Sequence, residues 1–458
     1  MSDFRNSALH YAQDHHDRFL AELKDFVSIA SVSTDPQHKL EIEEAAEWVA
    51  GQLRGLGLAG VGIYPTKGHP VVYGESLSAG LNAPTVLVYG HYDVQPPEPL
   101  ELWQSNPFTP EQRGDNLYGR GAADMKGQVL ASIKALEAII QTGGLPINIK
   151  FLIEGEEEIG SPGLEKFIID HKELLACDFA LNPDTGMLGP DLPTITYALR
   201  GLAYFELRVL GPVHDLHSGV YGGVVHNPAQ ALCELIAGMH DAHGRVTLPG
   251  FYARVRQLDA GERGELARLP TDEEFYLAQT GATTLWGEVG YSPTERVGAR
   301  PTLEVNGLYS GFTGEGAKTV LPAWAMAKIS TRLVPDQDPD EVYQQLKDYL
   351  KINTPETVRT ELTQITGGPA SISDRTSKSV KAMEDALNSV WGKRPLFRRE
   401  GGSVPVVSFF KNILGAESVN SGFSLPDDNL HGPNEKQHLP TWYKGIDSLI
   451  HFYLNLGE

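Results

Sequence analysis

Short apolar runs alternate along the first 185 positions with longer segments whose apolar residues recur at helical spacing. Residues 39–57 show this spacing and end at glycine, and residues 129–140 repeat it. The short apolar runs predict strands at 61–65, 69–75, 85–90, 147–155 and 178–184. Strands that alternate with helices predict an α/β domain, with a central mixed, largely parallel sheet flanked by helices.

The pattern changes near Arg200. The following residues predict three strands and two helices in the order 201–212 (strand), 227–244 (helix), 323–335 (strand), 338–353 (helix) and 358–366 (strand). A stretch rich in glycine, proline and arginine separates the first helix from the second strand and ends near residue 300. This series predicts a smaller α+β (ferredoxin-like) domain inserted into the first one. We therefore expect a first domain made of residues 1–198 and 372–458, and an inserted domain made of residues 199–371.

The length of the chain indicates how many domains it forms, and its charge indicates which partners it does not favour. With 458 residues the chain is long enough for two domains, and its formal net charge is −21. Such an acidic chain without a basic patch does not favour binding to nucleic acid or to anionic membranes. No stretch of about 18 apolar residues predicts a membrane span, and the polar N-terminus lacks a signal-peptide core. The two cysteines, Cys177 and Cys233, lie far apart, which is typical of a cytoplasmic protein.

Candidate metal ligands lie where apolar runs end. They are His91, Asp124, Glu158, Asp184 and His431. Two imidazoles and three carboxylates are a donor set that suits two divalent ions, and three carboxylates offset most of the charge of two such ions. A bound divalent ion makes water available as a nucleophile near neutral pH. The pattern therefore predicts a two-metal hydrolase.

The residues around these candidates fit the same chemistry. Asp93 follows His91 by two positions, so in an extended chain both side chains point to the same side, where a carboxylate can orient the imidazole. Glycines flank Asp124 and let the backbone bend. The acidic run at 154–158 is compatible with a solvated surface. Because it directly follows an apolar strand, it also fits one metal ligand beside one general base.

Five further motifs carry a resemblance to a known family: RGLAYFELRV, LHSGVYGG, GEGAKTVLP, STRLVPDQ and REGGSVP. With the metal motifs, they make the whole chain resemble the dinuclear zinc aminoacylase and carboxypeptidase family of metallopeptidases. Within it, the chain is most similar to the branch of cytosolic nonspecific dipeptidase and carnosinase. The resemblance implies hydrolysis of the peptide bond of dipeptides, with two zinc or manganese ions per subunit.

The resemblance also implies a role for each candidate. Asp124 would bridge the two metals, His91 and Asp184 would complete one site, and Glu158 and His431 would complete the other. Glu157 would be the general base. Three consecutive glutamates leave a shift of one residue open, so Glu156 is the alternative base. Asp93 would be the carboxylate behind His91, and the peptide bond after Asp124 would be cis.

In the inserted domain, the resemblance implies that His217 polarises the scissile carbonyl. It also implies that Arg332, Gly402 and Ser403 hold the terminal carboxylate of the substrate, which suits a guanidinium and backbone amides. In dimeric relatives this histidine comes from the partner subunit. We therefore expect a homodimer that forms through the inserted domain, which would act as a lid and dimerisation domain.

Two other functions stay open at this point. An N-acyl-amino-acid deacylase would use the same dinuclear site on the same type of amide bond. A binding protein that has lost catalysis would keep the fold without the chemistry. The presence of every expected ligand and of a base favours an enzyme.

Overall fold

The computed structural model describes residues 2–402 and 404–458 of the chain. The chain forms two compact units. Unit 1 comprises Met1–Tyr197, Ser373–Phe397 and Pro405–Glu458, and unit 2 comprises Ala198–Ile372 and Arg398–Val404. Unit 2 thus includes a short segment near residue 400, whereas the sequence analysis assigned all residues from 372 onward to the first domain.

A mixed sheet forms the centre of unit 1. Its strands run in the order β1-β2-β6-β3-β7-β17-β8. They are β1 (Ala59–Tyr64), β2 (Val71–Ser76), β3 (Thr85–His91), β6 (Asn148–Glu154), β7 (Phe179–Asn182), β8 (Thr194–Leu199) and β17 (Glu417–Asn420). The central strands β6, β3, β7 and β17 pair in parallel, and the outer pairs are antiparallel. The five strands predicted for this part are confirmed, and with them the mixed α/β fold.

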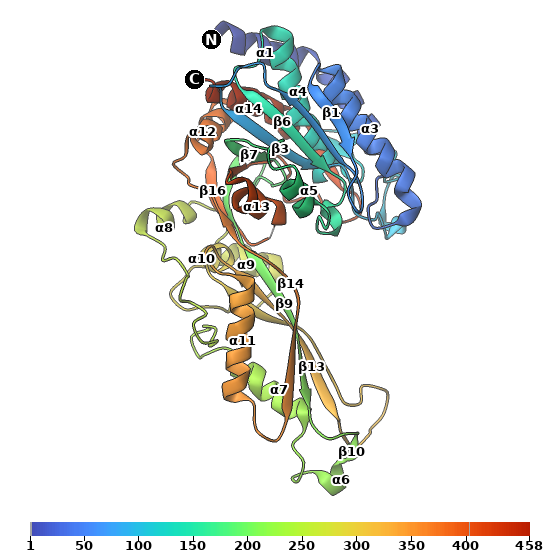
Figure 1. Cartoon of the computed structure of the whole chain (residues 1–458), viewed down its shortest axis with the longest axis vertical. Coiled ribbons are helices and arrows are strands. Elements are labelled where there is room, and N and C mark those ends of the chain that lie inside the picture. Colours follow the sequence, from blue (N-terminus) through green and yellow to red (C-terminus); the bar gives the residue numbers. More distant parts are fainter. Residues whose placement is uncertain (1, 403) are drawn as a thin grey trace. The chain divides into compact units, whose positions relative to one another are not determined.

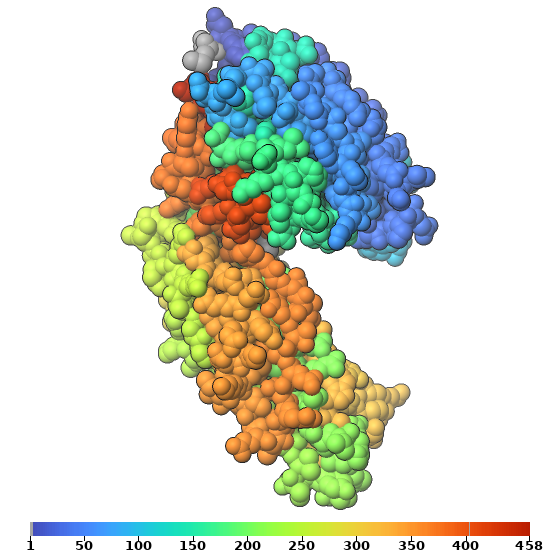
Figure 2. Space-filling view, in the orientation of Figure 1, coloured from blue at the N-terminus to red at the C-terminus, as the bar shows by residue number. Residues whose placement is uncertain are grey.

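Helices cover this sheet (Figure 1). They are α1 (Ser2–Asp14), α2 (His16–Ser28), α3 (Lys39–Gly55), α4 (Gly127–Thr142), α5 (Leu164–Asp170), α12 (Lys378–Trp391), α13 (Pro405–Phe409) and α14 (Leu439–Leu456). Helix α3 packs on β1 and β2, while α4 packs against α1 and α14. Because α4 is covered on all sides, nearly all of its residues are buried. The last part of the chain thereby joins the first, and Figure 2 shows residues near 410 beside α5.

Unit 2 contains a four-stranded antiparallel sheet in the order β11-β13-β9-β14. Its elements are β9 (Gly201–Leu210), α7 (Pro228–Ala237), β11 (Thr302–Ser310), β13 (Trp324–Leu333), α11 (Pro339–Asn353) and β14 (Arg359–Gly368). Alternate residues of β9, such as Phe205 and Leu207, are fully buried in a core that both helices complete. The succession β-α-β-β-α-β with this strand order is the ferredoxin-like arrangement that the sequence predicts.

Strand β11 is an element that the sequence analysis missed. It lies at the edge of the sheet, and most of its side chains are exposed or half-buried. A bulge between Val305 and Gly307 also interrupts its pairing with β13. An edge strand of this kind contains no long apolar run, so its sequence does not predict a strand. Helix α7 also ends at Ala237, earlier than predicted.

The stretch that precedes β11 has structure of its own. It contains three short helices, α8 (Ala260–Leu266), α9 (Glu273–Thr280) and α10 (Pro293–Ala299). Ser292 caps α10 in a capping box with Glu295. The smaller elements of the chain are β4 (Glu111–Arg113), β5 (Asn116–Tyr118), β10 (Leu216–His217), α6 (Ser218–Tyr221), β12 (Val320–Leu321), β15 (Ser371–Ile372), β16 (Leu396–Glu400) and β18 (Lys436–His438). Within the described part of the chain, no helix combines the length and the apolar character that crossing a membrane requires.

Candidate metal centre

The carboxyl ends of the parallel strands of unit 1 carry four of the candidate residues. His91 is the last residue of β3, and Asp184 lies two residues after β7. Glu157 and Glu158 lie just after β6, in a single helical turn, Glu157–Ile159. Because β3, β6 and β7 are parallel neighbours, these ends meet at one edge of the sheet.

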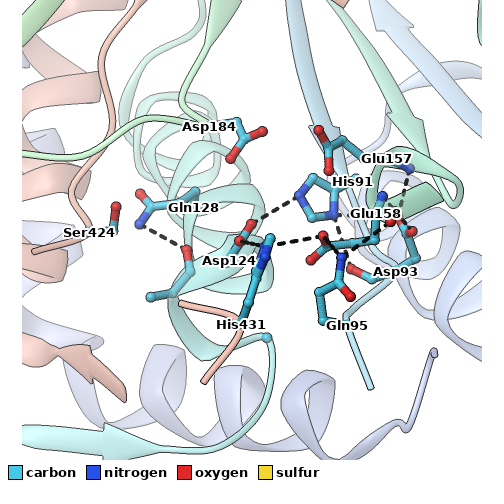
Figure 3. Close-up of polar contacts among 12 residues, drawn as sticks. His91, Asp93, Gln95, Asp124, Gln128, Glu157, Glu158, Asp184, Ser424 and His431 are labelled. Carbon is cyan, nitrogen blue, oxygen red and sulfur yellow. Dashed lines mark hydrogen bonds and ion pairs between the residues drawn. The ribbon is translucent and has the colours of Figure 1, made fainter. Parts of the chain in front are cut away.

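Asp124 lies between the two candidate histidines (Figure 3). One of its carboxylate oxygens, Oδ1, is 3.2 Å from Nε2 of His91, and the other, Oδ2, is 3.0 Å from Nε2 of His431. The same Nε2 of His431 is 3.2 Å from Oε2 of Glu158. A carboxylate whose two oxygens face two different imidazoles has the arrangement that a ligand shared by two metals requires. The peptide bond between Asp124 and Met125 is cis, as the resemblance implied.

The donor atoms form two overlapping groups that fit divalent cations. Within each group the ligand atoms lie within 4.8 Å of one another. The groups are His91, Asp124 and Glu158, and His91, Glu157 and Asp184. Burial raises the pKa of Asp184 to about 7, and the nearby carboxylate of Asp124 adds to this. Burial, together with the carboxylates of Asp184 and Glu158, also raises the pKa of Glu157 well above its usual value. Several half-buried carboxylates this close together repel one another unless cations neutralise them, and the residues therefore fit a two-metal site.

Asp93 contacts three of the candidate residues, namely His91, Glu157 and Glu158. Its backbone oxygen is 3.0 Å from Nδ1 of His91, and its carboxylate is 3.4 Å from the same nitrogen. The carboxylate also accepts the backbone N–H groups of Glu157, at 3.2 Å, and Glu158, at 3.1 Å. Asp93 thus orients the imidazole, so that Nε2 faces Asp124, and at the same time positions the turn that carries both glutamates.

The structure separates the three consecutive glutamates. Glu157 and Glu158 each belong to one of the two donor groups. The carboxylate of Glu156 instead lies against Gly68 and Gly163, where a Cβ atom on either glycine would collide with it. Gln95 was not predicted, and it donates a hydrogen bond to Oε2 of Glu158 at 2.8 Å. The three glutamates are therefore not equivalent, although the sequence presents them as a uniform run.

The candidates in unit 2 lie in two places. His217 is an exposed residue at the end of β10, and its Nδ1 accepts the backbone N–H of Gly219 at 3.0 Å. Arg332 lies near the end of β13, paired across the sheet with Leu202 and Thr302. Ser403 lies outside the described residues.

The backbone oxygen of Gly402 accepts the N–H of Arg200 at 3.1 Å. The side chain of Arg200 donates to the backbone oxygen of Gly401 at 3.2 Å. Burial, followed by repulsion from the guanidinium of Arg332, lowers the pKa of Arg200 to about 10. The structure thus brings Arg200, Arg332 and the Gly401–Gly402 turn together, and the sequence analysis missed Arg200 because it treated the residue only as the start of a new segment.

Comparison of the sequence with known proteins shows which family this chain belongs to. The sequence pattern of Peptidase family M20/M25/M40 matches residues 87–455. The chain belongs to this peptidase family. It is 32% identical to the Cys-Gly metallodipeptidase of Candida albicans over 461 residues, which cover 95% of this chain and 94% of the relative. It is 30% identical to the human Beta-Ala-His dipeptidase, with 98% and 92% covered. The resemblance inferred from the motifs is confirmed.

A solved structure of the family agrees over nearly the whole chain. The M20 family metallo-carboxypeptidase Sso-CP2 of Sulfolobus solfataricus superimposes with a TM-score of 0.83 at 32% identity, covering 96% of this chain and 99% of that one. This agreement includes both units, so the inserted ferredoxin-like unit is part of the shared M20 architecture.

Glu435 and Arg120 are residues of this M20 peptidase that the sequence analysis missed. Glu435 is fully buried, and its carboxylate forms an ion pair with Arg120 at 2.6 Å. The same carboxylate accepts the backbone N–H groups of Gly121 at 2.9 Å, and of Ala123 and Asp124 at 3.1 Å each. Arg120 in turn donates to the backbone oxygen of Gly432, next to His431. In the sequence, Glu435 is only a glutamate four residues after His431, and this spacing does not predict its contact with Asp124.

Proposed function

We propose that the chain is a metal-dependent dipeptidase that uses two divalent ions, zinc or manganese, in the site around Asp124. The observation that carries this proposal is the position of Asp124, with each carboxylate oxygen facing a different histidine at the carboxyl edge of a parallel sheet. Relatives named as dipeptidases match the chain over almost its entire length, which supports a dipeptide substrate.

In this proposal, which follows the resemblance and differs from the two donor groups described above, His91 and Asp184 would hold one ion, Glu158 and His431 would hold the other, and both ions would share Asp124. When bound, the ions would activate the attacking water and polarise the peptide carbonyl. Glu157 would take the proton of the water and deliver it to the departing amine.

We propose that His217 stabilises the negative charge that develops on the carbonyl oxygen. Because Nδ1 of His217 accepts the N–H of Gly219, the proton of the neutral ring lies on Nε2. That N–H points away from the hydrogen bond and can donate to an oxyanion. A donor of this kind typically contributes about 3–4 kcal/mol to the stability of the transition state.

We further propose a homodimer in which His217 serves the site of the partner subunit. Large apolar side chains that follow His217 closely in the sequence, lie on the edge strand β11 or come just after that strand are exposed. They are Val220 at 64%, Val224 at 81%, Leu308 at 57%, Tyr309 at 50% and Phe312 at 45%. An edge strand with exposed apolar side chains favours pairing with another chain, and a two-fold axis would bury both copies.

Arg332 and Arg200, together with the backbone at Gly402, are the proposed anchor for the terminal carboxylate of the substrate. Burial and the nearby guanidinium of Arg332 disfavour the charged form of Arg200, and an anion bound beside Arg200 would stabilise that charge. The requirement for a free carboxylate distinguishes a peptidase that acts at a chain end from an enzyme that cleaves internal bonds.

The test is a single comparison of substrates with the metal-free protein reloaded with zinc or with manganese. We expect Ala-Ala to be hydrolysed with a higher kcat/KM than Ala-Ala amide, Ala-Ala-Ala or N-acetyl-alanine, and we expect chelation to abolish the activity. A lost charge-assisted hydrogen bond costs about 1.5–3 kcal/mol, so the amide should react at least about tenfold more slowly. Equal or faster hydrolysis of N-acetyl-alanine would favour a deacylase. Faster hydrolysis of Ala-Ala-Ala would contradict a preference for dipeptides.

A further inference from the structure

Glu154 is a buried acid of unit 1 that the proposed chemistry does not use. It is the last residue of β6, and only 1% of its surface is exposed. Its backbone lies beside that of His91 in the parallel pairing of β6 with β3. Burying a carboxyl group is unfavourable unless hydrogen bonds replace those it made with water. The hydrogen-bond partners of Glu154 therefore indicate what this acid does at the carboxyl edge of the sheet.

One oxygen of Glu154 accepts two buried hydroxyl groups. Its Oε1 accepts the hydroxyl of Tyr89 at 2.7 Å and the hydroxyl of Ser161 at 2.9 Å. Tyr89 belongs to the central strand β3. Ser161 ends the turn of residues 156–161, which we call the glutamate turn because it carries Glu157 and Glu158. Glu154 therefore connects the centre of the sheet to the end of the glutamate turn.

The backbone at the end of the glutamate turn is unusual. Gly160 and Ser161 have φ values of 86° and 53°, so both lie in the left-handed region. Glycine adopts this conformation readily, whereas it is unfavourable for serine. Two hydrogen bonds of Ser161 stabilise it: the hydroxyl donates to Glu154, and the backbone N–H donates to the backbone oxygen of Glu156 at 2.8 Å. Without its hydroxyl, Ser161 would be held in this conformation less firmly.

The glutamate turn is thus held at both ends. At its start, the carboxylate of Asp93 accepts the backbone N–H groups of Glu157 and Glu158 (Figure 3). At its end, Ser161 is fixed to Glu154. We propose that Glu154 is a positioning residue that acts through Ser161, and that it holds the carboxylates of Glu157 and Glu158 in place for metal binding and proton transfer. The inference rests on the proposed function, because the two glutamates have these tasks only in a metal-dependent hydrolase.

The first measurement is made on metal-free protein. Hydrogen exchange, followed by mass spectrometry, compares the wild type with Ser161→Ala, which removes one hydroxyl and little volume. We expect exchange in peptides that cover residues 156–161 to become about tenfold faster, as the loss of one buried hydrogen bond implies. Ser373→Ala is the matched control, because Ser373 is a buried serine of unit 1 whose hydroxyl donates to the backbone oxygen of Ser418 at 2.6 Å. This control should leave exchange in residues 156–161 unchanged.

The second measurement concerns the metal site itself. Competition with a chromophoric chelator should show that Ser161→Ala binds zinc or manganese about 10–100-fold more weakly, the usual effect of removing support behind a ligand. With saturating metal, kcat for Ala-Ala should fall by about tenfold or more while KM changes little, because a misplaced base slows the chemistry without weakening the binding of the substrate. Ser373→Ala should change neither the metal affinity nor kcat.

A double variant tests whether Ser161 acts through Glu154. Glu154→Met removes the acceptor and keeps a side chain of similar length. If the two residues act as a unit, Glu154→Met combined with Ser161→Ala should lose no more metal affinity than Glu154→Met alone. Fully additive losses would overturn the inference. If Glu154→Met does not fold, the comparison of Ser161→Ala with Ser373→Ala still decides.

These measurements separate failure of the inference from failure of the proposed function. If no dipeptide is hydrolysed, but Ser161→Ala speeds exchange in the glutamate turn and weakens metal binding, the dipeptidase function fails and the positioning role stands. If Ala-Ala is hydrolysed and Ser161→Ala matches the wild type in exchange, metal affinity and kcat, the positioning role is overturned and the function stands. Faster exchange throughout unit 1 would show a general structural role and would also overturn the inference.

Discussion

The carboxylate of Glu435 accepts the backbone N–H of Asp124 at 3.1 Å, so a buried acid outside the two donor groups positions the central residue of the proposed metal site. The same carboxylate pairs with Arg120, and Arg120 donates to the backbone oxygen beside His431. Two loops more than 300 residues apart in the sequence are thereby connected. Such support behind the ligands typically changes metal affinity by about 10–100-fold.

We therefore predict that Glu435→Gln weakens metal binding by about 10–100-fold. Glutamine keeps the shape of the side chain but loses the negative charge, and its NH₂ group cannot accept the N–H groups that now point at the carboxylate. Competition with a chromophoric chelator measures the affinity directly, without reference to turnover. Asp427→Asn is the matched control, because its side chain is 74% exposed in the same region and should leave the affinity unchanged. An unchanged affinity in Glu435→Gln would contradict the positioning role.

The proposed roles of the consecutive glutamates give the second prediction. Glu157→Gln should retain both metals and lose about 10²–10⁴-fold in kcat, because the water would lack its base. Glu156→Gln should have a small effect on kcat, since its carboxylate lies against Gly68 and Gly163. Metal analysis and steady-state kinetics on both variants provide the test. A severe loss in Glu156→Gln with a mild one in Glu157→Gln would exchange the two roles.

The third prediction concerns the proposed dimer. His217→Ala and Glu157→Gln should each be inactive, yet a mixture that exchanges subunits should regain activity. Half of the randomly reassorted dimers are hybrids, and one of the two sites in each hybrid combines an intact base with an intact histidine of the partner. Recovery should therefore approach roughly a quarter of the wild-type activity per site. If exchange is demonstrated by mass spectrometry and no activity returns, His217 does not act across the interface.

The fourth prediction concerns pH and stability at a position distant from the metals. Asp447 of α14 is largely buried, and burial raises its pKa to about 7, although a hydrogen bond with Gln13 opposes the shift. The folded protein therefore keeps a proton that the unfolded chain releases above about pH 4. This contribution to the free energy of unfolding is fully present below about pH 4 and is lost as the pH rises to about 7.

Asp447→Asn removes this titration. The variant should match the wild type near pH 4 and exceed its free energy of unfolding by up to about 4 kcal/mol at pH 8, at about 1.36 kcal/mol per pKa unit. Thermal unfolding of metal-free protein, followed by circular dichroism at both pH values, measures the difference. Asp3→Asn is the control, an exposed carboxylate of α1 whose loss should change little at either pH. A stabilisation that is equal at both pH values would show that Asp447 is charged in the folded protein.

The sequence alone was enough to predict most of the elements. The runs that became β3, β6 and β7 are buried on both faces of the sheet, so most of their residues are apolar and the runs are easy to recognise in the sequence. Most residues of the edge strand β11 are exposed or half-buried, so its sequence contains polar residues and lacks the apolar run that predicts a strand.

The sequence by itself was enough to predict candidate donors for the site, because ligand chemistry restricts metal binding to a few residue types, and most of these candidates occur in motifs that follow strands. Only the tertiary structure decided how the donors are arranged. The two oxygens of Asp124 face different histidines because the loop of His431 folds back onto the loop of Asp124, and Glu435 joins the two loops. Arg200 likewise became a candidate substrate-binding residue only because the fold places it near Arg332, more than 100 residues away in the sequence. The pattern of apolar and polar residues along a segment indicates the helix or strand that this segment forms. Contacts between segments that are distant in the sequence depend instead on how the whole unit packs.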